Sequence, residues 1–109
     1  MTRFLTTLVV FACLAGPGLA DVTGDYTAKG RNADGSVYSG TARLTETDGM
    51  VTVNWTVGTS SYSGTGPING DVVTIDWGAA SPVVYVVMPD GELHGTWADG
   101  AALEKLTPR

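Results

Sequence analysis

Tight-turn dipeptides recur along this chain at intervals of about ten residues, and that spacing strongly limits the possible folds. Asp or Asn followed by Gly is favoured in two-residue hairpin turns, where both central residues need positive φ. Weaker breaks at Gly58-Thr59 and at 78–82 continue the series. The strong signals are Asp34-Gly35, Asp48-Gly49, Asn69-Gly70, Asp90-Gly91 and Asp99-Gly100. Seven turns separate eight segments, and an even number permits a closed up-and-down sheet.

The segments between the turns alternate apolar and polar residues in the manner of strands. Residues 50–57, MVTVNWTV, place Val and Trp on one face and Thr and Asn on the other, and 72–77 and 92–97 behave alike. In 92–97 the alternation turns His94 outward. The stretch 82–88, PVVYVVM, is apolar throughout, so we expect it to be enclosed on both faces. The pattern predicts an all-β fold, a small eight-stranded antiparallel up-and-down barrel or a strongly coiled meander.

The tetrapeptide Tyr-Ser-Gly-Thr occurs twice, beginning at Tyr38 and at Tyr62, each time ahead of a turn and a strand that bears Trp. This indicates one hairpin copied within a meander. The Gly of each copy shares a face with its Tyr, so we expect it to leave room for indole rings in a narrow barrel. We interpret the repeat as architecture rather than as a binding motif.

The first twenty residues are typical of an export signal. A basic start leads into the apolar run 4–14, and small residues precede a cleavage site after Ala20. That run is shorter than the roughly 20 residues that span a bilayer. Cleavage would leave 21–109 as a single domain in the periplasm or secreted. The alternative is a lipid anchor on Cys13, the only cysteine.

The charge balance and the scarcity of reactive side chains narrow the possible functions. Eleven acidic residues against six basic ones argue against nucleic acid and anionic membranes. The single His94 has no evident nucleophile beside it, and the turn Asp residues are explained by their backbone role. We therefore predict no catalytic residue, metal site or cofactor, and no enzyme activity. Asp25 and Asp76 are expected to pair across strands with Lys29 or Arg43.

Aromatic side chains provide the one candidate site. In a small barrel they could line a ligand cavity at one mouth. The preferred alternative is that they fill the interior, because an eight-stranded barrel is barely wide enough for its own side chains. The candidate residues are Trp55, Trp77, Trp97, Tyr38 and Tyr62.

Two long stretches carry a family resemblance. GDYTAKGRNADGSVYSGTARLT, residues 24–45, contains Gly-x-Tyr-x-x-x-Gly-x-Asn-x-Asp-Gly-Ser-x-Tyr-x-Gly, and 83–108 contains Val-Val-Tyr, Asp-Gly, Gly-x-Trp and Glu-x-Leu-Thr-Pro. This resembles a group of small exported proteins of proteobacteria, some labelled as fibronectin-binding. Many members carry a cysteine pair in the middle strands, which this sequence lacks. The architecture is similar to that of avidins, lipocalins and barrel-shaped bacterial metalloprotease inhibitors.

These observations lead to an expected function. We expect an exported, monomeric, non-catalytic binding protein of the bacterial envelope, engaging a protein or an envelope component. One alternative is a carrier that takes a small apolar ligand into the barrel mouth. The other is a protease-inhibitor-like barrel, in which residues 21–24 would enter the protease.

Overall fold

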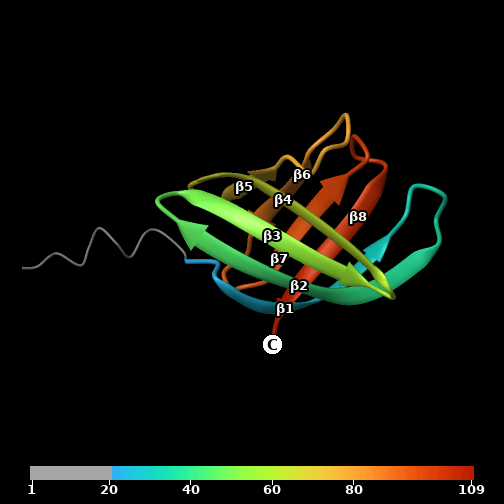
Figure 1. Ribbon diagram of the computed structural model, residues 1–109, viewed down its shortest axis with the longest axis horizontal. Coiled ribbons are helices and arrows are strands. Elements are labelled where there is room, and N and C mark those ends of the chain that lie inside the picture. The colour runs from blue at the N-terminus through green and yellow to red at the C-terminus, as the bar shows by residue number, and fades with distance from the viewer. Residues whose placement is uncertain (1–20) are drawn as a thin grey trace, which may run out of the picture.

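Eight antiparallel strands form a closed barrel in the computed structural model, which describes residues 21–109 (Figure 1). Each strand pairs with the next along the chain, and β8 pairs back with β1. The predicted all-β up-and-down barrel is confirmed, while the predicted signal peptide and Cys13 lie outside the described residues. The strands are β1 (Gly24–Arg31), β2 (Val37–Thr47), β3 (Met50–Val57), β4 (Ser60–Asn69), β5 (Val72–Ile75), β6 (Val83–Val87), β7 (Leu93–Trp97) and β8 (Ala102–Pro108). Residues 21–109 contain no helix long and apolar enough to cross a membrane.

All seven predicted turns coincide with the connections between strands, but they do not share one geometry. Both residues have positive φ at Asp48-Gly49, as a two-residue hairpin turn requires. Asp99-Gly100 also has positive φ at both residues, but it lies in a four-residue connection between the paired Trp97 and Ala102. At Asp34 and Asp90 only the following Gly has positive φ. There the Asp carboxylate accepts a hydrogen bond of 2.9 Å from the backbone N–H two residues later. The same dipeptide therefore makes a turn in two ways, through its backbone or through its side chain.

The predicted alternation of inward and outward residues holds, with one correction at β6. Val83 and Tyr85 point into the barrel and are buried, whereas Val86 on the outer face is 45% exposed. The expectation that this strand is enclosed on both faces was wrong. A barrel of a single sheet has only one interior, so apolar side chains on the outside of its wall stay at the surface.

The structure shows what the glycines of the Tyr-Ser-Gly-Thr repeat make room for. A Cβ on Gly40 would collide with the carbonyl oxygen of Thr56 in β3, and one on Gly64 would lie 2.6 Å from that of Asp76. Both positions allow the backbone of a neighbouring segment to approach closely. Both glycines thus make room for backbone, which helps the sheet to curl into a barrel, and at Gly64 the Cβ of Trp77 also lies only 2.9 Å from that position.

One end of the barrel is filled with aliphatic side chains and sealed by the segment before β1. Val22 is only 2% exposed. Its carbonyl oxygen accepts a hydrogen bond of 2.6 Å from the Tyr26 hydroxyl, and its N–H donates one of 3.2 Å to Glu46. We call this the closed end; the β2–β3, β4–β5 and β6–β7 turns surround it. Residues 21–24, the suggested protease probe, are held against the barrel by these contacts.

The expected cross-strand ion pairing occurs for one of the two carboxylates. Arg43 Nη1 lies 3.0 Å from Asp25 Oδ2, between paired positions of β1 and β2, and both side chains are exposed. Asp76 instead accepts a hydrogen bond of 3.0 Å from the backbone N–H of Gly78. It supports the turn after β5 rather than a bridge between strands.

Candidate ligand cavity with a buried carboxylate

A cavity of about 420 Å³ occupies the opposite, open end of the barrel. The β1–β2, β3–β4, β5–β6 and β7–β8 connections surround this end, because alternate hairpins of an up-and-down barrel lie together (Figure 1). All five candidate aromatic residues line the cavity, so the filled interior that we expected is found only at the closed end. The lining residues are Asn32, Tyr38, Trp55, Val57, Tyr62, Trp77, Val83, Trp97 and Glu104.

The floor of this cavity holds a buried carboxylate that the sequence analysis missed. Glu104 on β8 is 7% exposed, the one charged or polar residue among the buried side chains of the described chain. It points inward because it alternates with Leu103 and Lys105, which are exposed. Its register neighbours are Gly30 on β1 and Gly95 on β7. On each of the two neighbouring strands, the position beside Glu104 is therefore a glycine and carries no side chain.

Two tyrosines occupy the space that these glycines leave open. Tyr38 is paired with Gly30, Tyr85 is paired with Gly95, and a Cβ on either Gly would collide with the ring of its partner. Both hydroxyls thereby reach Glu104 from opposite sides. Tyr38 donates to Oε1 at 2.8 Å, and Tyr85 donates to Oε2. The register thus builds one row across five strands, in which the carboxylate lies between two phenol groups.

A third donor reaches the carboxylate from across the barrel. Trp55 Nε1 on β3 lies 3.0 Å from Glu104 Oε2 and 3.0 Å from the Tyr85 hydroxyl. All three of these groups donate to Glu104, so its carboxylate oxygens act as acceptors. Burial and then the charge of Glu104 raise the pKa of Tyr85 well above its ordinary value, and the same two causes raise the pKa of Tyr38. Both phenols therefore keep their protons and remain donors.

Above this floor the aromatic rings meet edge to face. Trp77 is central, with ring centroids 6.3 Å from Trp55, 6.3 Å from Tyr62 and 5.7 Å from Trp97. Tyr38 packs in the same way on Trp97, at 6.3 Å. The planes are inclined by 64° to 87°, so the faces of neighbouring rings point in different directions. The rings therefore surround the cavity at steep angles to one another and do not form a parallel stack.

The indole N–H groups of all three Trp are used within the protein. Trp55 bonds to Glu104 and Tyr85 as described, and Trp97 Nε1 donates to the Tyr38 hydroxyl at 3.1 Å. Trp77 Nε1 donates to the carbonyl oxygen of Ser81 at 3.1 Å, which ties the rim of the cavity to the β5–β6 connection. The rings thus contribute their π surfaces to the cavity, and their polar edges hold the walls in place.

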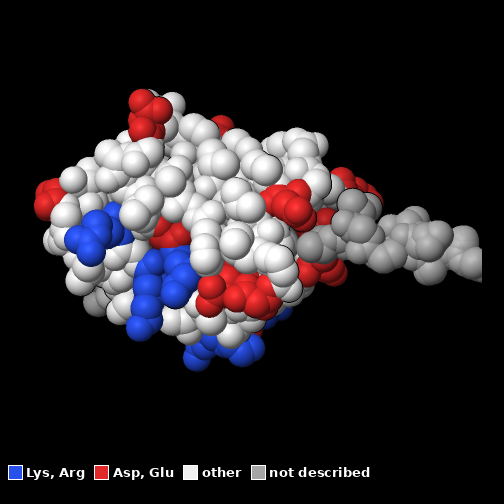
Figure 2. All heavy atoms as spheres, turned by 180° about the vertical axis from the view of Figure 1, so that it is seen from behind, with Lys and Arg blue, Asp and Glu red and all other residues white. Residues whose placement is uncertain are grey.

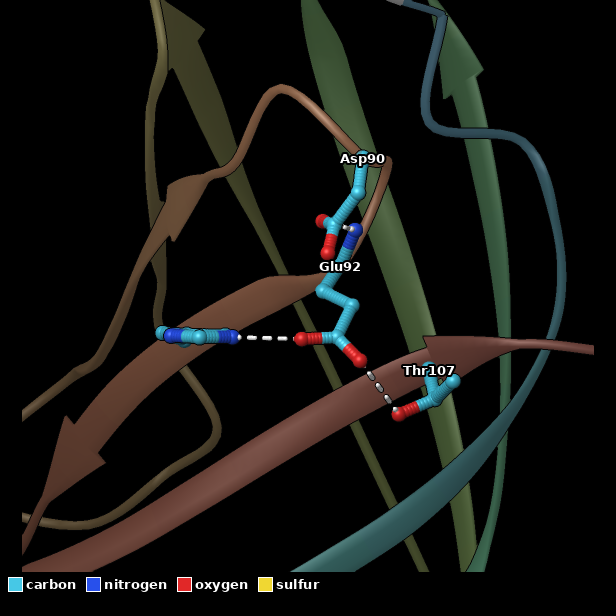
Figure 3. Close-up of polar contacts among 4 residues, drawn as sticks. Asp90, Glu92 and Thr107 are labelled. Atoms are coloured by element: carbon cyan, nitrogen blue, oxygen red, sulfur yellow. Dashed lines mark hydrogen bonds and ion pairs between the residues drawn. The ribbon is translucent and has the colours of Figure 1, made fainter.

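His94 lies outside this site, on the outer wall of the barrel as predicted. Its Nε2 is 2.8 Å from Glu92 Oε1, and Thr107 donates a bond of 3.3 Å to the other oxygen of the same carboxylate. Figure 3 shows Glu92 reaching from the β6–β7 turn toward Thr107 on β8, with its backbone N–H bonded to Asp90. The Glu92 carboxylate lies between the His94 ring and the Thr107 hydroxyl, so these contacts join the β6–β7 turn to β8.

The basic side chains also lie on the outside. An open depression on the outer wall is lined by basic residues, namely Lys29, Arg31, His94 and Lys105. Lys29 and Lys105 are paired with each other across β1 and β8. Seen from behind, the Lys and Arg side chains gather in the lower part of the molecule, beside acidic ones (Figure 2). Glu104 lines this depression as well as the cavity, but none of the four basic side chains lines the cavity.

Comparisons with known proteins give no information about this site. No family model, curated protein or solved structure matches the chain. Within residues 21–109, no three His, Cys, Asp or Glu side chains come together in a group that could hold a metal ion.

Proposed function

We propose that this protein is a non-catalytic binding protein that takes a small organic molecule into the open end of its barrel. The observation that carries the proposal is the contrast between a fully packed closed end and a cavity walled by five aromatic rings. Its volume of about 420 Å³ lies in the range of small-molecule sites, which are mostly apolar with a few placed polar groups. The proposal adopts the carrier alternative of the sequence analysis.

The cost of building this end supports a role beyond stability. Burying a carboxylate requires that its lost hydration be replaced by hydrogen bonds, and an apolar side chain at position 104 would avoid that requirement. An unfilled space beside large rings also forfeits packing contacts. Departures from the rules of core packing are typical of functional sites. Binding of a ligand in this cavity would account for both the buried carboxylate and the unfilled space.

The experiment that tests the proposal uses the intrinsic fluorescence of the protein. Residues 21–109 contain three Trp, and all three line the cavity. The neutral apolar probe N-phenyl-1-naphthylamine is titrated into the protein while Trp emission and probe emission are followed. We expect saturable quenching of Trp together with a blue shift of the probe. Unchanged emission of both, up to the solubility of the probe, would overturn the assignment of an apolar-ligand cavity.

A pair of matched variants locates the bound probe. Val57 lines the cavity, whereas Val86 is 45% exposed on the outer wall. Val57→Phe reduces the free volume and should weaken probe binding at least tenfold, while Val86→Phe should leave it within twofold of the original protein. Equal effects of the two changes would mean that the probe binds elsewhere.

A further inference from the structure

The charges around the cavity are all of one sign. Glu104 is the only charged residue among those that line it, and no Lys, Arg or His of the described chain joins it there. The ion pairs in residues 21–109 are Arg43 with Asp25 and His94 with Glu92, both on the outer surface. The three groups bonded to Glu104 are neutral hydroxyl and indole donors. They satisfy the oxygens of the carboxylate without bringing a positive charge to it, and none of the ion pairs of residues 21–109 includes Glu104.

The walls add negative electrostatic potential of a second kind. The face of an aromatic ring carries the negative part of its quadrupole, and Trp attracts cations most strongly. Three Trp and two Tyr surround this cavity, with neighbouring planes inclined by at least 64°. All five rings line the cavity, so their surfaces surround a group placed at its centre. A positive group at the centre would be attracted by the ring faces and by the carboxylate below them.

An anionic ligand would meet the opposite conditions. It needs a cation or several free donors, and the three indole N–H groups are already bonded to Glu104 and Tyr85, to Tyr38 and to Ser81. The Tyr38 hydroxyl is also taken, because it donates to Glu104. The other donors of the lining are the neutral Tyr62 hydroxyl and the Asn32 amide, which donates to Ser36. A neutral apolar ligand would gain from the ring surfaces but would leave the charge of Glu104 without a partner. The lining is therefore selective by charge as well as by shape.

From these contacts we propose that the ligand is a small organic cation, such as a substituted ammonium group on an apolar or aromatic body. The ammonium group lies among the rings above Glu104, and the apolar body extends toward Tyr62 at the rim. This inference rests on the proposed function, because it specifies which molecules the same cavity accepts. It adds the carboxylate, which an unselective apolar carrier would not need.

The test uses three probes that share a phenyl ring and differ in the charge of one substituent, the neutral one being titrated up to its solubility in water. Phenyltrimethylammonium is cationic, tert-butylbenzene is its neutral isostere, and benzenesulfonate is anionic. Each is titrated into residues 21–109 at constant ionic strength while Trp emission is followed. We expect the cation to bind at least tenfold more tightly than its neutral isostere, and the anion more weakly than either.

The outcomes separate this inference from the function on which it rests. If the neutral isostere or the anion binds as tightly as the cation, the inference is overturned while the cavity stands as a ligand site. If none of these probes and no neutral apolar probe changes Trp emission, both proposals are overturned. The ranking of the three probes is measured on the unaltered protein, so it decides the matter without any variant.

Variants then identify the source of the preference. Glu104→Gln removes the charge and keeps the shape, and it should reduce cation affinity at least tenfold while the neutral isostere changes less than twofold. Tyr62→Leu removes one ring face at the rim, where this side chain is 47% exposed, without touching the bonds to Glu104. It should also weaken the cation more than the isostere. A loss of both probes to the same extent in Tyr62→Leu would assign the selectivity to shape instead.

Discussion

At the closed end of the barrel Leu44, Leu93 and Leu106 are 0% exposed, whereas at the open end five aromatic rings surround a cavity of about 420 Å³. The same eight strands build both ends, and the difference lies in which residues point inward along each strand. On β8, Leu106 belongs to the packed end and Glu104 to the cavity, two residues apart. Two successive inward positions can thus serve different purposes, one in stability and one in recognition.

The comparison also shows how the open end keeps its shape without a packed centre. Its side chains are fixed by hydrogen bonds that run from Trp97 through Tyr38 to Glu104, and from Trp55 and Tyr85 to the same carboxylate. At the closed end, apolar packing performs the same task. A polar network that is fully satisfied can hold side chains in place about as firmly as close packing can.

The largest expected effect tests the closed end. Leu106→Ala should lower the free energy of unfolding by about 2–5 kcal/mol, because it leaves a hole in a packed aliphatic core. The matched control is Leu103→Ala on the same strand, where the side chain is 50% exposed and the change should stay within about 0.5 kcal/mol. Urea unfolding followed by far-UV circular dichroism measures both. Similar losses of unfolding free energy in the two variants would mean that inward and outward side chains of β8 contribute equally to stability.

The second prediction compares the two copies of the repeat. Tyr38→Phe removes a hydroxyl that donates to a buried carboxylate and accepts from Trp97, and it should cost roughly 1.5–3 kcal/mol of stability. Tyr62→Phe removes the equivalent hydroxyl from the exposed rim and should change stability by less than about 0.5 kcal/mol. The measurement is again the free energy of unfolding. If both variants lose the same free energy of unfolding, the hydrogen bonds at Glu104 contribute no more to stability than an exposed hydroxyl does.

The third prediction concerns alkaline pH. The pKa of Tyr85 is raised in the fold, while in the unfolded chain it titrates near its ordinary value of 10.0. Above that pH the unfolded chain binds fewer protons than the folded one, so stability is full below about pH 10 and falls as the pH rises, by up to roughly 1.4 kcal/mol per pH unit. Tyr85→Phe should lack this part of the slope in thermal unfolding between pH 9 and 11. An unchanged slope would place the Tyr85 proton outside the network.

Much of the fold follows from local sequence signals. Asp48-Gly49 and its equivalents mark the turns, and the alternation in MVTVNWTV sets the inward face of β3, so the number and order of strands are predictable. The role of Gly40 was not predictable in this way. It depends on how closely the carbonyl group of Thr56 approaches, which is a property of the curled sheet rather than of the sequence near that glycine.

The site was predictable in its aromatic part but not in its floor. Trp55, Trp77 and Trp97 stand at inward positions of strand-like segments, which is enough to place them inside a barrel. Tyr38 and Glu104 are separated by 66 residues, and only closure between β8 and β1 brings them together. A signal for Glu104 was nevertheless present. The alternation in ALEKLTP gives it the same face as two apolar residues, and a charged residue on an inward face is rare enough to mark a site.

Closure of the sheet also bears on how this chain behaves when it is concentrated. The segment VVYVV of β6 has the uncharged, β-branched and aromatic composition of segments that stack into fibrils. In the barrel its backbone groups are paired with β5 on one side and β7 on the other, and the pairing of β1 with β8 leaves none of the eight strands as an edge. A second molecule thus finds no strand that is free along its whole length, and the stretch paired on one side only, residues 60–64 of β4, lies away from β6. Fibril formation by this protein should therefore require that the barrel first open, and its onset should follow unfolding rather than concentration alone.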